Sequence, residues 1–153
     1  MTSIKNNYAL GRFAEKCSLP LGTDGILVIP LQNTTLPTDA VLRNCANLGA
    51  VFTAGGVEGN FTNSGARRVL AAADITITVN TTTFLVNVAL ATQNYAAAGG
   101  AVNNTISKIV VAYRPTSGTA DSGCMVLATQ DYSATTGGGA LTIAPGILTD
   151  DAP

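Results

Sequence analysis

Residues 107–133 read SKIVVAYRPTSGTADSGCMVLATQDYS, and this stretch decides the fold class. Apolar residues alternate along 109–114 and again along 124–128, with the period of two that is typical of β-strands. The loop between these runs is rich in Pro, Ser, Gly, Thr and Asp, which favour turns. The stretch therefore predicts two antiparallel strands joined by a loop.

Several of the predicted strands are apolar on both faces. Small apolar residues occupy positions that would meet water in a one-sided sheet, namely Ala89, Ala91, Val110, Ala112 and Val126. A sheet with one solvated face normally carries polar residues there. We therefore expect both faces to be covered by a second sheet, by helices or by a partner chain.

Other segments predict further strands. The nearly continuous apolar run at 25–31 is typical of a buried strand, and Pro30 indicates a strand end or an edge. Residues 75–79 alternate Ile and Val with Thr, and after a short NTT turn the next strand places Phe84, Val86, Val88 and Leu90 on one face. Residues 140–144 predict the last strand.

Two segments near the start have helical spacing. Residues 7–17 predict a short helix with the apolar stripe Leu10, Phe13, Ala14 and Cys17. Residues 39–53 predict a longer helix, because Thr38 or Asp39 is placed to cap its start and a Gly pair follows its end.

These elements predict a mainly β protein, an antiparallel β-sandwich-like domain with one or two short helices in the N-terminal third. The chain has 153 residues, the length of a single domain. Residues 1–24 are expected to form an N-terminal arm with a short helix. Residues 25–145 would form the β-rich domain, including the helix near 39–53. Residues 146–153 lack periodicity and are expected to form an extended C-terminal tail.

The composition is poor in charge. Charged residues make up 11% of the chain and the net charge is −1, whereas an average soluble domain has about 25% charged residues. Hydrophobic residues reach 46%, and the mean hydropathy is +0.32. The low net charge argues against nucleic acid or an anionic membrane as a partner. We interpret the scarcity of charge as a surface covered by neighbouring subunits; the alternative is a Thr- and Asn-rich β domain solvated by hydroxyls and amides.

No apolar run is long enough to cross a bilayer, and the first residues lack the apolar core of a signal peptide. We therefore expect the protein to be made and kept in a cytoplasm. The three cysteines, Cys17, Cys45 and Cys124, are far apart, which predicts reduced thiols acting as small buried hydrophobes.

The sequence offers little for catalysis. Histidine is absent, which excludes Ser/His/Asp and Cys/His arrangements, and the cysteines lack the spacing of a zinc site. Asp150 and Asp151 are adjacent but lie in the tail. The remaining candidates for paired acid and base groups are Glu58, Asp74, Asp121 and Asp131. Asp121 is also the one candidate for a calcium ligand, although a turn-stabilising role fits it better. We predict no catalytic, cofactor-binding or metal-binding residues.

Three further features have structural explanations. The Gly-rich segments lack the Lys-Ser/Thr of a phosphate-binding loop and are interpreted as turns. Arg67-Arg68 is the only basic pair, and a local ion pair accounts for it better than nucleic-acid binding. Tyr8 is a candidate for contact with a partner, whereas the other tyrosines are expected to pack.

The order of segments resembles that of a known family. The chain has an N-terminal NYALGRFAEK, a strand, and then LPTDAVLRNCANLGAVFTAGGVEGNFTNSGARRVL. ITITVN, YAAAGGAVNNTISKIVVAYRP, GTADSG and LATQDYSATTGGGALTI follow. Over residues 7–145 this resembles the head decoration, or cement, proteins of tailed bacteriophages.

The resemblance implies a virion structural protein and not an enzyme. Such a protein binds the outer surface of an assembled capsid, often as a homotrimer, and cements neighbouring subunits of the major capsid protein. Two alternatives remain open. One is a subunit of another surface assembly, such as a fibre, pilus or adhesin module. The other is an enzyme or carbohydrate-binding module with a pocket lined by Tyr113, Arg114 or Asp131.

Overall fold

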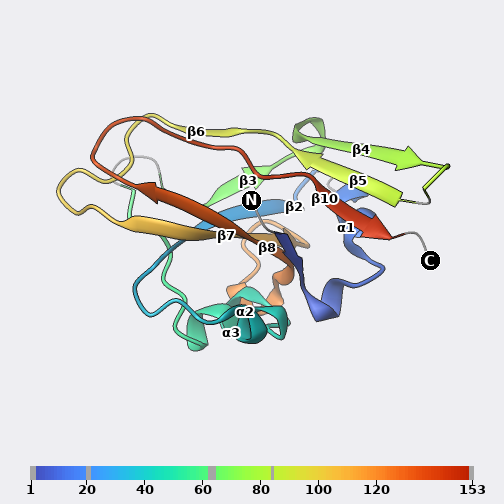
Figure 1. The fold of residues 1–153 in the computed structure, drawn as a ribbon, viewed down its shortest axis with the longest axis horizontal. Helices are drawn as coiled ribbons and strands as arrows, with labels where there is room; N and C mark the ends of the chain where they lie inside the picture. The colour runs from blue at the N-terminus through green and yellow to red at the C-terminus, as the bar shows by residue number, and fades with distance from the viewer. Residues whose placement is uncertain (1–2, 20–21, 62–64, 84, 152–153) are drawn as a thin grey trace.

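The computed structural model describes residues 3–19, 22–61, 65–83 and 85–151, and it shows a mainly β protein with antiparallel sheets (Figure 1). The predicted fold class is confirmed. The larger sheet has five strands, which in order across it are β1 (Ser3–Lys5), β8 (Met125–Thr135), β7 (Thr105–Arg114), β2 (Gly25–Gln32) and β3 (Arg68–Leu70).

The opening stretch forms the centre of this sheet. β7 and β8 are antiparallel neighbours, with Val110 opposite Thr129. The connecting loop ends in a short 3-10 helix, η3 (Asp121–Gly123). Alternation along β7 sends Ile109 and Val111 to one core and Val110 to the other, as the period of two predicts.

β2 is an interior strand, yet Pro30 is tolerated in it. β3 pairs only with the first part of β2, up to Val28, so Pro30 lies where that side of the strand is no longer in a regular ladder. There the Pro30 carbonyl accepts a hydrogen bond from the N–H of Gly59 at 2.9 Å. The missing donor of proline therefore costs no ladder hydrogen bond.

A second layer lies over one face of the larger sheet. It consists of a three-stranded sheet, β10 (Leu148–Asp151), β5 (Leu85–Leu90) and β4 (Ile75–Asn80), and a two-stranded sheet, β6 (Gln93–Tyr95) and β9 (Leu141–Ile143). The 3-10 helix η2 (Ala72–Asp74) leads into β4.

β4 and β5 form the predicted hairpin, and its turn is held by the Asn80 side chain. Asn80 Oδ1 accepts hydrogen bonds from the N–H groups of Thr82 and Thr83, both at 3.0 Å. The register places Val88 opposite Ile77, so the apolar faces of the two strands coincide as expected. Phe84, assigned to the same face from the sequence, lies outside the described residues.

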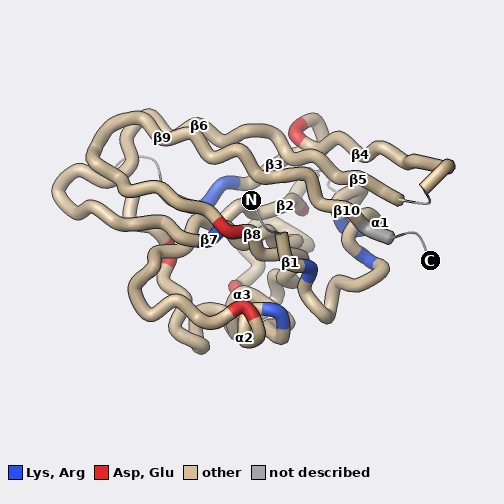
Figure 2. The backbone as a smooth tube through the Cα atoms, viewed as in Figure 1, with Lys and Arg blue, Asp and Glu red and all other residues tan. Residues whose placement is uncertain are grey.

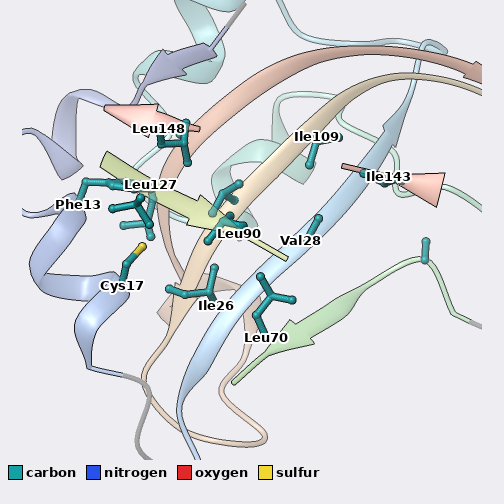
Figure 3. Packing of buried hydrophobic residues seen from close by; sticks show 14 of the residues in the cluster. Phe13, Cys17, Ile26, Val28, Leu70, Leu90, Ile109, Leu127, Ile143 and Leu148 are labelled. Carbon is teal, nitrogen blue, oxygen red and sulfur yellow. The ribbon is translucent and has the colours of Figure 1, made fainter. Parts of the chain in front are cut away.

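The larger hydrophobic core lies between these layers (Figure 3). Its labelled members come from all three sheets and from the N-terminal helix: Phe13, Cys17, Ile26, Val28, Leu70, Leu90, Ile109, Leu127, Ile143 and Leu148. Burial of apolar area is the main term that favours folding, and here it joins the N-terminal and C-terminal segments to one core.

The opposite face of the larger sheet is covered by two helices, α2 (Asp39–Arg43) and α3 (Leu48–Thr53). A second core forms there, in which Leu42, Leu48 and Val51 pack against Val110 and Val126. The expectation of a covered second face is wrong for Ala89 and Ala91, which are only partly buried, with Ala89 opposite exposed Thr76. It is confirmed for β7 and β8, where Val110, Ala112 and Val126 are buried on the side of the helices. The cover comes from a second sheet and from helices, so these strands need no partner chain to bury them.

The single helix expected over 39–53 is two helices. Thr38 caps α2, as predicted, by accepting a hydrogen bond from the N–H of Val41, but Asn47 starts a new helix by accepting one from the N–H of Ala50 at 2.9 Å. Between them the Ala46 carbonyl accepts from the N–H of Val126. Pairing with β8 interrupts the helix, so the part of the chain that the structure describes contains three short α-helices.

The N-terminal segment belongs to the domain. β1 pairs with β8, and after the 3-10 helix η1 (Asn7–Ala9) comes α1 (Phe13–Ser18). The expected stripe is only partly buried: Phe13 and Cys17 are in the core, whereas Leu10 is 57% exposed. Gly11, with φ of 72°, breaks the helix before Phe13, because this conformation is left-handed.

The C-terminal segment is also part of a sheet. β10 runs antiparallel to β5, with Leu148 opposite Val88, and Leu148 is 2% exposed. The structure therefore places residues 148–151 in a strand where the sequence predicted an extended tail. The isolated apolar residue Leu148 gave no periodic signal because the strand is only four residues long.

Candidate interaction surface

Four of the five strands in the second layer contain no charged residue. Residues 75–107 and 132–149 contain no Lys, Arg, Asp or Glu, and together they supply β4, β5, β6 and β9. In Figure 2 these strands form a layer of tan backbone above the larger sheet. We call β4, β5, β6 and β9, with the charge-free loops that precede or follow them, the neutral layer.

The outer face of the neutral layer is polar but uncharged. Thr76, Thr78, Asn94 and Thr142 are exposed, and the Thr142 hydroxyl donates a hydrogen bond to Asn94 Oδ1 at 2.9 Å. The inner face is apolar because alternate residues, such as Tyr95, point into the core. The layer therefore offers hydroxyl and amide groups to a partner.

Apolar side chains are also exposed on the neutral layer. The exposed fractions are 37% for Ile77, 64% for Val79, 52% for Val102 and 63% for Ile147. Scattered exposed apolar residues are ordinary on a soluble protein. Because these apolar side chains lie in a layer without charge, removing water from this surface costs little free energy. The centres of protein interfaces are likewise depleted of charged residues.

The charged side chains lie elsewhere, and two groups of them form ion pairs that connect different elements of the fold. The first group is centred on Lys108 of β7, which is 7% exposed. Its ammonium group contacts Asp131 on β8 and lies 2.7 Å from Asp39 of α2. Burial lowers the pKa of Lys108, but the hydrogen bonds to Asp131 and Asp39 outweigh it, so the pKa is raised.

The second group is centred on Arg67. Its guanidinium lies 2.6 Å from Asp121 and 2.8 Å from Glu58, and it faces the ring of Phe52 at 5.8 Å. Burial acts to lower the pKa of Arg67, but hydrogen bonds to Asp121 and Glu58 raise it on balance. This group links the 3-10 helix η3 to the segment that precedes β3. The predicted local ion pair of Arg67 is confirmed, whereas Arg68 lies over the ring of Tyr95 at 4.4 Å.

The four carboxylates considered for acid–base work are placed in separate structural contacts. Glu58 and Asp121 come together, but through Arg67 between them. Asp74 accepts a hydrogen bond from the N–H of Ala71, and Asp131 binds Lys108. The side chains of Asp150 and Asp151 lie outside the described residues.

The residues proposed to line a ligand pocket are not brought together. Asp131 pairs with Lys108, whereas Tyr113 is five residues further along β7 and hydrogen-bonds to Asp24. Five residues of a strand span about 17 Å. The Tyr113 and Asp131 side chains therefore belong to different ends of the sheet.

The cysteines and the calcium candidate also have structural roles. Cys17, Cys45 and Cys124 are buried thiols without a disulfide, as expected, and burial raises the pKa of Cys45 and Cys124. Asp121 is bound to Arg67, which would compete with a cation. Among the described residues, no three His, Cys, Asp or Glu side chains gather in a way that could hold a metal ion.

A shallow pocket of about 480 Å³ lies beside β1. It is lined by Ser3, Ile4, Lys5, Asn7, Leu10 and Arg43. Two cations and no carboxylate contribute to this lining, so it lacks the acid–base pair considered from the sequence. Tyr8, next to the lining residue Asn7, is 55% exposed, which is compatible with the partner contact suggested for it.

Comparison of the chain with family models, with curated proteins and with solved structures found no match. In the part of the chain that the structure describes, no helix has the length and apolar character needed to cross a membrane.

The neutral layer was missed by sequence reasoning, although its signal was present. Two charge-free runs, 75–107 and 132–149, are visible in the sequence. What the sequence did not show is that both runs lie in the same layer of the fold.

Proposed function

We propose that this chain is a virion structural protein that binds the outer surface of an assembled phage capsid and cements neighbouring capsid subunits. The observation that carries the proposal is the neutral layer, which offers a broad uncharged surface of Thr, Asn and small apolar side chains. The resemblance to head decoration proteins supplies the identity of the partner, the major capsid protein.

An uncharged surface suits binding to a large protein lattice. Charged groups must lose water when an interface forms, and this cost often equals or exceeds what their pairing returns. Interface centres are accordingly depleted of charge. Charged residues such as Lys108 and Arg67 form ion pairs outside the neutral layer. A partner can therefore cover this layer without desolvating them.

Cementing follows from selective binding. A protein that binds the assembled shell and not its free subunits stabilises the shell by mass action. If several copies associate, each copy raises the effective concentration of the others at the lattice, which strengthens attachment. The resemblance implies a homotrimer as the associating unit, made in the host cytoplasm and located on the outer capsid surface of the virion. Nucleic acid, membrane, cofactors and catalysis have no part in this proposal.

Binding to shells tests the proposal directly. Purified chain would be mixed with expanded, DNA-free heads of the phage whose genome encodes it, and bound chain would be measured after sedimentation of the heads. Thr142→Asp and Val102→Asp place a charge in the neutral layer and should reduce binding at least tenfold. Val57→Asp changes a residue that is 39% exposed outside that layer, and it should bind as the wild type does.

Wild-type chain that does not bind the heads would refute the capsid proposal. Binding that is lost in Val57→Asp but kept in both neutral-layer variants would refute the assignment of the surface. Circular dichroism of each variant would establish that a loss of binding is not a loss of folding.

A further inference from the structure

We propose that β4 pairs edge to edge with β4 of a second copy of this chain, in an antiparallel register that places Ile77 opposite its counterpart. The inference concerns the edge of the three-stranded sheet, and it stands independently of the proposed attachment to a capsid.

β4 is an edge without the usual protection. Edge strands expose unpaired N–H and C=O groups, and proteins block them with charges, proline, bulges or short length. Of the four strands that edge the two larger sheets, three carry charge: Lys5 in β1, Arg68 in β3, and Asp150 and Asp151 in β10. β4 has six residues, ITITVN, with no charge, no proline and no register shift.

The backbone groups of β4 point the right way for this pairing. The Asp74 carbonyl accepts from the N–H of Ala91 at 2.7 Å, so at Asp74 the backbone faces β5. Backbone orientation alternates along an antiparallel strand. Thr76 and Thr78 therefore also face β5. The N–H and C=O groups of Ile77 and Val79 and the C=O of Ile75 point outward from the edge, whereas the N–H of Ile75 donates a hydrogen bond to the Ala72 carbonyl.

The register with Ile77 at its centre uses both outward groups of Ile77, and it lets the N–H of Val79 donate to the Ile75 carbonyl of the second copy. It places Ile75 opposite Val79 of the second copy and Ile77 opposite Ile77. Each of these is a pair of residues whose backbone groups face the other strand, as a hydrogen-bonded antiparallel pair requires. A shift by one residue would oppose outward-facing Ile77 to inward-facing Thr78 and would lose these bonds.

The side chains match in the same register. Ile75, Ile77 and Val79 share one face of β4, and the two threonines share the other. With Ile77 opposite Ile77, apolar residues meet apolar residues and Thr76 meets Thr78. Cross-strand pairs of like polarity stabilise a sheet. Residues 76–80 are exposed, and Val79 is 64% exposed, so apolar area remains to be covered.

The symmetry of the contact is two-fold. Antiparallel pairing of identical strands relates the copies by a two-fold axis, which makes the contact self-complementary and closed at two copies. The two three-stranded sheets would join as one six-stranded sheet. The β4–β5 hairpin projects at one end of the molecule (Figure 1), so a second copy can approach its edge. A two-fold contact does not build a ring of three, and the homotrimer proposed above would need a different surface.

The mass of the chain in solution tests the pairing. Sedimentation equilibrium up to about 1 mM chain, a concentration that detects weak association, should show a species of twice the chain mass of 15.5 kDa. Ile77→Lys and Ile77→Glu would each place like charges opposite one another, and each should be monomeric. An equimolar mixture of the two variants should restore the dimer, because opposite charges then meet. Val102→Lys, at an exposed site away from the edge, should remain dimeric.

Cysteine crosslinking tests the register. Residues in a hydrogen-bonded antiparallel pair have Cα atoms about 5.5 Å apart, within the range that a disulfide spans. Ile77→Cys should therefore link two copies on mild oxidation. Val79→Cys should not, because four residues of a strand separate the two copies of residue 79 by about 13 Å. The native cysteines are buried and should not interfere.

A wild-type monomer at every concentration would overturn the proposal, as would a dimer that persists in Ile77→Lys. Equal crosslinking of Ile77→Cys and Val79→Cys would overturn the register. A trimer that is unaffected by Ile77→Lys would also refute pairing through β4, while leaving the proposed capsid function intact.

Discussion

The ammonium group of Lys108 lies 2.7 Å from the carboxylate of Asp39 and joins the five-stranded sheet to the first turn of α2. The same group contacts Asp131 on the adjacent strand. One buried cation thus connects two strands and a helix that are far apart in the sequence, and the contact is a specific target for mutation.

Lys108→Met should destabilise the protein by about 1–2 kcal/mol. Methionine keeps part of the packing of the lysine stem but removes the charged hydrogen bonds. The carboxylates of Asp39 and Asp131 are each 49% exposed, so water can solvate them after the change and limit the cost. Urea unfolding would measure the difference. The control is Arg12→Met in the exposed pair with Glu15, which should cost less than about 0.5 kcal/mol.

The stabilisation by Lys108 should depend on pH at its alkaline end. The folded-state pKa of Lys108 is raised above its ordinary value of 10.5, so its contribution is complete below that pH and is lost as the pH rises through the raised value. The difference in unfolding free energy between wild type and Lys108→Met should therefore shrink above pH 10.5. A difference that grows with alkaline pH would contradict this assignment.

Tyr95 should make the folded protein sensitive to alkali. Burial raises its pKa from 10.0 to about 12, and the positive charge of Arg68 offsets only part of this. Between these values the unfolded chain loses the tyrosine proton while the folded chain keeps it, so stability falls as the pH rises. Tyr95→Phe should show a weaker decline over this range in urea titrations at fixed pH.

At neutral pH the same variant should be less stable by about 1 kcal/mol, because the hydroxyl of Tyr95 donates a hydrogen bond to the Ala66 carbonyl. Tyr8→Phe is the matched control, since Tyr8 is 55% exposed. It should leave the neutral stability unchanged. An unchanged slope in Tyr95→Phe would remove Tyr95 as the source of the effect.

Adjacent residues of the C-terminal segment should respond very differently to truncation. Leu148 is 2% exposed and Ile147 is 63% exposed. Leu148→Ala should cost about 2–4 kcal/mol, because it removes buried methyl groups and leaves a cavity. Ile147→Ala should change stability by less than about 0.5 kcal/mol. Equal, small effects in thermal unfolding would show that β10 does not hold its place in the sheet.

Asn47 should stabilise the second helix of the pair that covers the sheet. Its side chain accepts a hydrogen bond from the N–H of Ala50, so Asn47→Ala should cost about 1 kcal/mol. Asn47→Asp keeps the acceptor and should retain most of the stability. Chemical unfolding of the three proteins would compare them, and an Asn47→Asp variant as unstable as Asn47→Ala would count against a capping role.

The sequence was most informative where a pattern is local. Alternation in 109–114 predicted β7, and alternation in 75–79 with a short turn predicted the β4–β5 hairpin. It failed for residues 44–47, where pairing with β8 interrupts the helix, and for Leu148, whose burial depends on a strand distant in sequence. Such contacts leave no trace in the spacing of nearby residues.

For the candidate surface too, the sequence shows which residues are present, whereas only the fold shows which of them lie together. Both charge-free runs can be seen in the sequence, but their place in one layer depends on how β4, β5, β6 and β9 are arranged. Glu58 and Asp121 could be named as carboxylates of interest, yet only the fold shows that Arg67 lies between them.

The sequence by itself determined that this is a mainly β chain without histidine chemistry and with little charge, because composition and the period of two are properties of neighbouring residues. The tertiary structure decided what covers each face of the central sheet, where the terminal segments lie, and which edge is left open. Those outcomes depend on the burial of apolar area summed over the whole chain, and no short segment contains that sum.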